Sequence, residues 1–173
     1  MKDVVIVDSV RTGLAKSFRG SFNLTRSDDM LAHCIDSLLD RNSSIDPVEV
    51  EDVVVGAASH AGEQDGNLVR LAVVLSKLPI TTAGLTINRF CSSGLQSIAI
   101  AANQISSGQT DIAIAGGVDS ISMRTRQEAG KSKQNKRLVE EKPDIFMAML
   151  FTQQECPSIR VSIIGCFRCK SLR

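Results

Sequence analysis

The strongest constraint on the fold is a regular alternation of short apolar segments with longer amphipathic ones. The short segments are rich in β-branched residues and predict strands, whereas the longer ones have helical periodicity. The expected strands are 4–7, 50–57, 85–87 and 112–115, and the expected helices between them are 27–39, 67–78 and 91–107. Apolar strands that alternate with helices are typical of a parallel sheet covered on both faces. The sequence therefore predicts an α/β layered fold with a mainly parallel sheet and helices on both faces.

Several of these helices carry end signals. Ser27 or Thr25 is expected to cap the first helix, because their hydroxyls can accept a hydrogen bond from a free N–H at its start. Asn67 opens the second helix. Gly108 follows the third helix and is typical of a C-terminal stop.

Composition excludes several classes of function. The 173-residue chain has no Trp or Tyr and only 6 Phe, so it lacks the stacking platforms of proteins that bind single-stranded nucleic acid. Its net charge of +1 argues against dedicated binding to nucleic acid or a membrane surface, and no apolar run approaches the length of a membrane span. Five cysteines without regular spacing favour a reducing compartment. We expect a cytoplasmic location, with mitochondrial and peroxisomal locations left open.

The charge is divided unevenly along the chain. Residues 1–123 contain 9 basic and 14 acidic residues, whereas residues 124–173 contain 11 basic and 5 acidic ones. The apolar periodicity also weakens after Met123. Such a division indicates regions with different roles or different histories.

The segment Asn88–Gln96 carries the most informative chemistry. A predicted strand ends before it, and Cys91 lies where the predicted helix begins. A helix N-terminus presents free N–H groups and a positive partial charge. These favour a thiolate and can bind the oxyanion formed when sulfur attacks a carbonyl. The pattern predicts covalent catalysis, although most free cysteines are small core residues.

Six segments together resemble the thiolase family, specifically the 3-ketoacyl-CoA thiolases or acetyl-CoA acyltransferases. They are Val10–Gly13, Glu63–Arg70, Asn88–Gln96, Gly116–Met123, Arg137–Glu141 and Phe146–Met149. The resemblance runs almost continuously from residue 3 to about 149, and the segment around Cys91 is the most specific. Asp119 and Ile121 stand where the family usually has Glu and Met.

The resemblance implies an acyltransferase that takes an acyl group as a thioester on Cys91. Acyl-CoA and coenzyme A would be substrates, with no other cofactor and no metal. The backbone N–H of Cys91 would contribute to an oxyanion hole, and Met149 would line the acyl pocket. Residues 1–123 would form the N-terminal α/β domain, 124–149 the start of the CoA-binding loop domain and 150–173 a divergent tail. The basic residues at 124–142 either face CoA phosphates or form an ordinary solvated surface.

Other parts of the thiolase machinery have no match in this sequence. Thiolases use a His in a G-H-P motif, a Cys in a C-x-G motif and an Asn in an N-E-A-F motif, and none of these occurs here. His33 and His60 lack that context. His33 is interpreted as a core-edge or surface residue, and His60 as an ordinary loop or interface residue. We therefore expect the chain alone to lack turnover. The resemblance also ends before the family's final strand. We expect an exposed sheet edge, and either a homo-oligomer or pairing with a full-length thiolase subunit.

The tail at 150–173 carries three of the five cysteines and suggests a reading-frame or splice discontinuity. A metal or redox site at Cys166-x-x-Cys169 is the alternative for the tail, and one such pair is a weak signal. Two other functions stay open for the chain. One is a non-catalytic fragment that pairs with full-length thiolase, and the other is an unrelated cysteine hydrolase, which would need a local His base.

Overall fold

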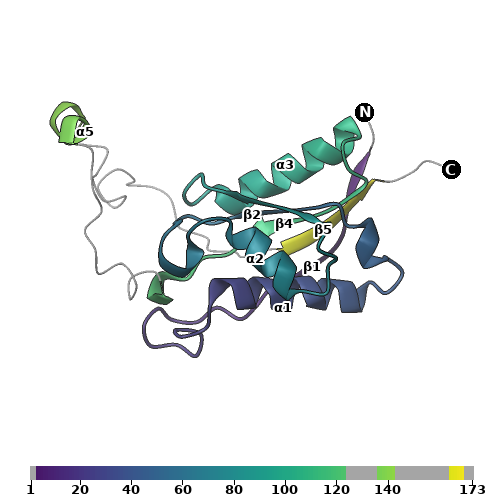
Figure 1. Ribbon diagram of the computed structural model, residues 1–173, viewed down its shortest axis with the longest axis horizontal. Helices are drawn as coiled ribbons and strands as arrows, with labels where there is room; N and C mark the ends of the chain where they lie inside the picture. Colours follow the sequence, from purple (N-terminus) through teal and green to yellow (C-terminus); the bar gives the residue numbers. More distant parts are fainter. Residues whose placement is uncertain (1–2, 124–135, 143–163, 170–173) are drawn as a thin grey trace. The chain divides into compact units, whose positions relative to one another are not determined.

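The computed structural model describes residues 3–123, 136–142 and 164–169. Its helices and strands follow the predicted order over residues 4–117 (Figure 1). The strands are β1 (Val4–Val10), β2 (Asp52–Gly56), β3 (Ala83–Ile87), β4 (Ile112–Gly117) and β5 (Ile164–Cys169). The helices are α1 (Ser27–Arg41), α2 (Leu68–Leu75), α3 (Ser93–Ser107) and α5 (Lys136–Glu141), with short 3-10 turns at Pro47–Glu49 and Gly62–Gln64. None of the helices in this described part is long and apolar enough to cross a membrane.

The strands form one sheet in the order β1-β5-β4-β2-β3. β2 pairs in parallel with both β3 and β4, whereas β5 runs antiparallel to its neighbours β1 and β4. Four strands thus point the same way and one opposes them. The predicted α/β fold with a mainly parallel sheet is confirmed.

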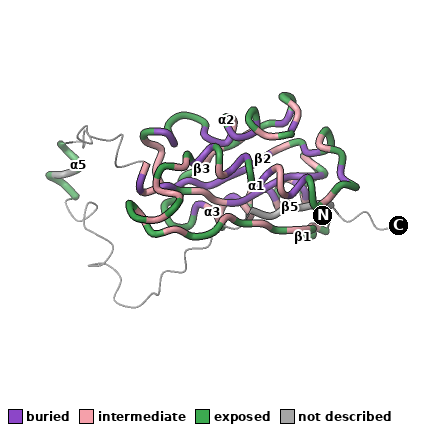
Figure 2. The backbone as a smooth tube through the Cα atoms, turned by 90° about the horizontal axis from the view of Figure 1, so that it is seen from below, coloured by how far each residue is buried: buried purple, intermediate pink, exposed green. Residues whose placement is uncertain are grey.

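Helices cover both faces of this sheet. Because side chains alternate along a strand, β4 contributes to two cores. Ile112 and Ile114 pack with apolar residues of α1 and α2, whereas Ala113 and Ala115 pack against α3. Figure 1 shows α3 on one side of the sheet and α1 on the other, and Figure 2 shows buried residues in the central elements and exposed ones along the outer loops. The small alanines on the second face let α3 approach the sheet closely.

One expectation about the sheet is wrong. We expected its final strand to be missing, but residues 164–169 form β5 between β1 and β4. Val10 pairs with Ile164 on one side, and Ala115 pairs with Gly165 on the other. Strand pairing uses backbone N–H and C=O groups, so a segment outside the family resemblance can supply the strand.

The chain divides into two compact units. One contains residues 1–128 and 162–173, and the other contains residues 129–161. In the second unit, α5 carries an exposed ion pair in which Arg137 Nε lies 2.6 Å from Glu141 Oε1. The boundaries predicted at 123 and 149 stay predictions.

Candidate active site

Three parallel strands end together at one edge of the sheet. Gly56 at the end of β2 is paired with Ile87 of β3 on one side and with Gly117 of β4 on the other. In α/β folds, ligands bind beyond the carboxyl ends of parallel strands. The loop from β3 to α3, residues 88–92, begins at this edge and carries Cys91.

Cys91 is exposed in that loop, whereas Cys34, the other cysteine whose side chain the structure describes, is buried on α1. Burial raises the pKa of the Cys34 thiol above its ordinary value. Of the two, Cys91 is therefore the thiol that a substrate can reach. α3 begins at Ser93, with Ser92 as its N-cap, so the prediction that Cys91 itself opens the helix is wrong.

A tight turn places Cys91 just ahead of the helix. Phe90 has a left-handed backbone conformation with φ of 48°, which is unfavourable for a residue with a bulky side chain. Ser93 Oγ accepts a hydrogen bond from the Arg89 N–H at 2.8 Å and donates one to the Phe90 carbonyl at 2.6 Å. One buried hydroxyl thus closes the turn, and this turn delays the start of α3.

Glycines let the N-terminus of α3 lie directly against the strand ends. A Cβ added at Gly56 would lie 2.3 Å from the carbonyl carbon of Ser93, and one at Gly117 would lie 3.2 Å from the Cα of Gly94. The first distance is too short for any side chain. The backbone of the loop is thereby held against β2 and β4.

Free N–H groups occur at Cys91 and in the first turn of the helix that follows it. Among the residues that the structure describes, the N–H groups of Cys91, Gly94 and Leu95 have no hydrogen-bond acceptor. Gly94 and Leu95 belong to the first turn of α3, where such groups carry the positive end of the helix dipole. The arrangement can stabilise negative charge on an oxygen beside Cys91.

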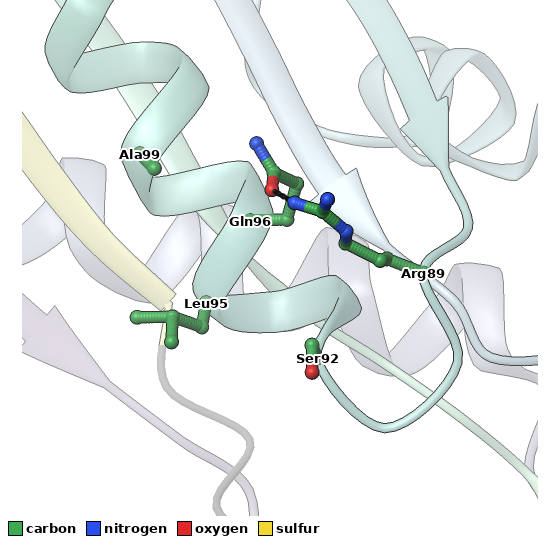
Figure 3. A pocket seen from close by; sticks show the side chains of 5 residues that line it. All are labelled: Arg89, Ser92, Leu95, Gln96 and Ala99. Carbon is green, nitrogen blue, oxygen red and sulfur yellow. Dashed lines mark hydrogen bonds between the residues drawn. The ribbon is translucent and has the colours of Figure 1, made fainter.

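A hollow of about 330 Å³ lies beside the loop along α3 (Figure 3). Its lining residues are Arg89, Ser92, Leu95, Gln96 and Ala99. The Arg89 guanidinium donates a hydrogen bond to the side-chain carbonyl of Gln96, as Figure 3 shows. This contact joins the base of the loop to the first turns of α3 from the outside.

A family model for the N-terminal domain of thiolases matches residues 4–156. The chain belongs to the thiolase family. It is 38% identical over 155 residues to a 3-ketoacyl-CoA thiolase of Bacillus subtilis, covering 90% of this chain and 39% of that protein. It is 42% identical over 119 residues to a 3-ketoacyl-CoA thiolase of Aliivibrio salmonicida, covering 69% of this chain and 31% of that protein. The chain thus spans less than half the length of these curated relatives.

The thiolase segment Glu63–Arg70 contains a buried junction. Gln64 is fully buried, and its amide nitrogen donates hydrogen bonds to the Ser59 carbonyl and to Asp119 Oδ1. Its side-chain oxygen accepts a hydrogen bond of 2.6 Å from the Ser120 N–H. Gln64 therefore ties the loop after β2 to the thiolase segment that follows β4.

The side chain of Glu63 lies at the start of α1. Both the N–H and the hydroxyl of Ser27 lie within hydrogen-bond distance of Glu63 Oε1, at 3.2 and 2.9 Å. Arg26 is the N-cap and makes no side-chain cap bond, so the prediction that Ser27 or Thr25 caps the helix is wrong. A buried carboxylate from another segment takes that role, at the positive end of the helix.

The remaining predicted residues lie elsewhere. Met149, and the segment 124–149 except for 136–142, fall outside the described residues. His33 is exposed on α1, and His60 is half-buried in the loop after β2, where its Nε2 has no partner among the described residues. Their assignment as surface and loop residues stays an interpretation.

The Cys166-x-x-Cys169 pair lies in β5. Within the described residues, no group of three His, Cys, Asp or Glu side chains is placed to hold a metal ion.

Sequence reasoning assigned no individual role to Ser93 or Gln64. Both fall in segments that resemble thiolases, which was the only signal available. The partner of Gln64, Asp119, is distant in the sequence. The partners of Ser93 are backbone groups, which leave no pattern in the sequence.

Proposed function

We propose that this chain carries the nucleophile-bearing half of a thiolase-type acyltransferase, with Cys91 as the residue that takes the acyl group. One observation carries the proposal. Cys91 is exposed in a strained turn at the carboxyl ends of three parallel strands, beside free N–H groups of α3. Membership of the thiolase family supports the same chemistry.

The proposed step begins when the Cys91 sulfur attacks the C3 carbonyl carbon of a 3-ketoacyl-CoA. The C2–C3 bond then breaks, its electron pair passes to C2, and C2 takes a proton to give acetyl-CoA while the acyl group stays on sulfur. The thiol of a second CoA attacks this thioester, which releases acyl-CoA and returns the Cys91 thiol. The N–H groups of Cys91 and Gly94 are available to the oxyanion in each attack.

The names of the two relatives support a 3-ketoacyl-CoA as the substrate. Degradation of fatty acids by β-oxidation is the setting that we propose, because the segment Glu63–Asn67 resembles the degradative thiolases more than the biosynthetic ones. In this proposal Met149 lines the acyl pocket and basic residues at 124–142 contact CoA phosphates. Lys136 is the first residue of α5, and Lys142 follows its last residue. Both side chains are exposed, which leaves them accessible to a phosphate.

We expect the 173-residue chain alone to have negligible turnover, because it contains no G-H-P, C-x-G or N-E-A-F motif. The test is a thiolysis assay with acetoacetyl-CoA and CoA, run beside alkylation of the cysteines by iodoacetamide. Cys91→Ala is the control in both. The expected result is no turnover, together with alkylation of Cys91 at least about tenfold faster than of Cys34.

Equal alkylation of Cys91 and Cys34 would contradict the assignment of Cys91 as the nucleophile. Turnover that disappears in Cys91→Ala would support the assignment and overturn the expectation of an inactive chain. Turnover that persists in Cys91→Ala would overturn both.

An exposed sheet edge favours a second candidate function, a non-catalytic fragment that pairs with a second copy or with full-length thiolase. Within the described residues, β3 pairs only with β2, and its Leu85 is exposed. Beside it, α2 presents Leu71, Val74 and Leu75 to solvent. Co-expression with a tagged full-length thiolase tests this function. Capture of the chain supports it, and loss of capture in Leu75→Glu locates the contact.

A further inference from the structure

We propose that Ser93 is the positioning residue that holds Cys91 in its reactive place. The inference rests on the proposed function, because it assigns to Ser93 the task of presenting the nucleophile. Ser93 is the first residue of α3 and lies two positions after Cys91. Its side chain is 3% exposed, so its hydroxyl faces protein rather than solvent.

The hydroxyl of Ser93 makes two hydrogen bonds within the turn. It accepts from the Arg89 N–H at 2.8 Å and donates to the Phe90 carbonyl at 2.6 Å, while the Ser93 N–H also donates to that carbonyl. A serine hydroxyl has a single proton, which here goes to Phe90. The side chain therefore binds the peptide group that joins Asn88 to Arg89 and the one that joins Phe90 to Cys91.

The hydrogen bonds of the Ser93 hydroxyl enclose a strained part of the backbone. Phe90 has φ of 48°, a conformation that bulky residues rarely adopt and that persists only when neighbouring contacts impose it. The hydrogen bonds from Ser93 are contacts of that kind. Relaxation of Phe90 to an ordinary φ would rotate the following peptide and move the Cys91 N–H and thiol away from the helix N-terminus.

Ser93 is itself immobilised by the sheet. A Cβ at Gly56 would lie within 2.5 Å of the Ser93 carbonyl carbon, carbonyl oxygen and Cβ, so Ser93 packs directly on the end of β2. The chain of contacts runs from Gly56 to Ser93, then to Phe90 and Cys91. Residues held in this way keep a reactive group within the narrow geometry that catalysis needs.

The test is the rate of iodoacetamide alkylation at each cysteine of the full 173-residue chain, located by peptide mapping. Ser93→Ala is expected to slow the alkylation of Cys91 by about tenfold, because fewer molecules keep the thiol at the helix N-terminus. The buried Cys34 reports folding in the same sample. The alkylation of Cys34 stays slow if the fold is intact.

Ser97→Ala is the matched control. Ser97 is another fully buried serine of α3, and its hydroxyl lies 2.5 Å from the Gly116 carbonyl oxygen and 2.7 Å from that of Gly94, but it makes no hydrogen bond to the turn. Its removal is expected to change the Cys91 rate less than about twofold. An unchanged Cys91 rate in Ser93→Ala would overturn the inference, as would equal slowing in both variants.

A second variant keeps the inference testable if Ser93→Ala loosens the fold. Asn adopts left-handed backbone more readily than Phe, so Phe90→Asn makes the turn less dependent on the hydroxyl. The slowing caused by Ser93→Ala is expected to be smaller in the Phe90→Asn background, and equal slowing in the two backgrounds would overturn the strain account.

The wild-type rates separate the two proposals. If Cys91 of the wild type is alkylated no faster than Cys34, the proposed function itself is overturned. If Cys91 of the wild type is alkylated fast and Ser93→Ala does not change that rate, only the role of Ser93 is overturned.

Discussion

A single buried amide, that of Gln64, connects segments that are distant in the sequence. It bonds the loop after β2 and the segment after β4, and its oxygen also lies 3.0 Å from the Ser27 hydroxyl at the start of α1. Gln64→Ala removes these bonds and leaves buried partners unsatisfied. We expect the free energy of unfolding in urea to fall by about 3 kcal/mol. The exposed Gln109→Ala is the control, with an expected change below about 0.5 kcal/mol.

Asp8 gives the fold an acid dependence. Its carboxylate accepts from the Asn42 side chain at 2.9 Å and pairs with Arg41 at 2.8 Å, which joins β1 to the end of α1. The Asn42 hydrogen bond, followed by the Ser9 N–H and the Arg41 charge, lowers the pKa of Asp8 below its ordinary value of 3.8. Because the pKa is lower in the folded state, the stabilisation is present above pH 3.8 and is lost as the pH falls through the folded value.

Asp8→Asn is therefore expected to melt below wild type near neutral pH, with the gap narrowing in acid. Thermal melts of the two proteins across a pH series measure it. A gap that stays constant down to strongly acidic pH would show that Asp8 stabilises the fold without its charge.

At the scale of elements, the contact between α3 and β2 is possible only because residue 56 is a glycine. Gly56→Ala would place a Cβ 2.3 Å from the Ser93 backbone, so α3 has to move. We expect a loss of about 3 kcal/mol in the free energy of unfolding and slower alkylation of Cys91. In Gly13→Ala the new Cβ would meet Phe22 at an ordinary 3.6 Å, so that variant should stay within about 1 kcal/mol of wild type. Similar losses in the two glycine variants would contradict the close-approach explanation.

For the whole molecule, the tail is a structural part of the sheet. Deletion of residues 162–173 removes β5 and leaves β1 without the only strand that it pairs with among the described residues. We expect the melting temperature to fall by about 10 °C or more and the β1 amides to lose protection from hydrogen exchange. Deletion of residues 171–173 alone is the control. Full protection of β1 without residues 162–173 would mean that β1 does not depend on β5.

Sequence reasoning predicted the order of elements and the place of Cys91, because both follow from local patterns. Apolar periodicity marks β4 and α1, and Gly108, with φ of 79°, ends α3 as expected. It missed β5, because residues 164–169 lie outside the part of the chain that resembles thiolases, and strand pairing needs only backbone groups. It also gave the start of α3 too early, since the turn at Phe90 is held by Ser93 through contacts that no local pattern reveals.

Ribosomal synthesis releases β1 long before its pairing partner exists. Val10 pairs with Ile164, and among the strands that the structure describes β1 has no other partner, so it waits until the nascent chain has been extended that far. Meanwhile the apolar side chains of Val5, Ile6 and Val7, which stay exposed even in the folded chain, are open to chaperones and to other nascent chains. We expect the soluble yield in cells to depend on how fast the ribosome reaches the codon for Ile164, and codon changes that slow only the stretch between β4 and β5 should lower it.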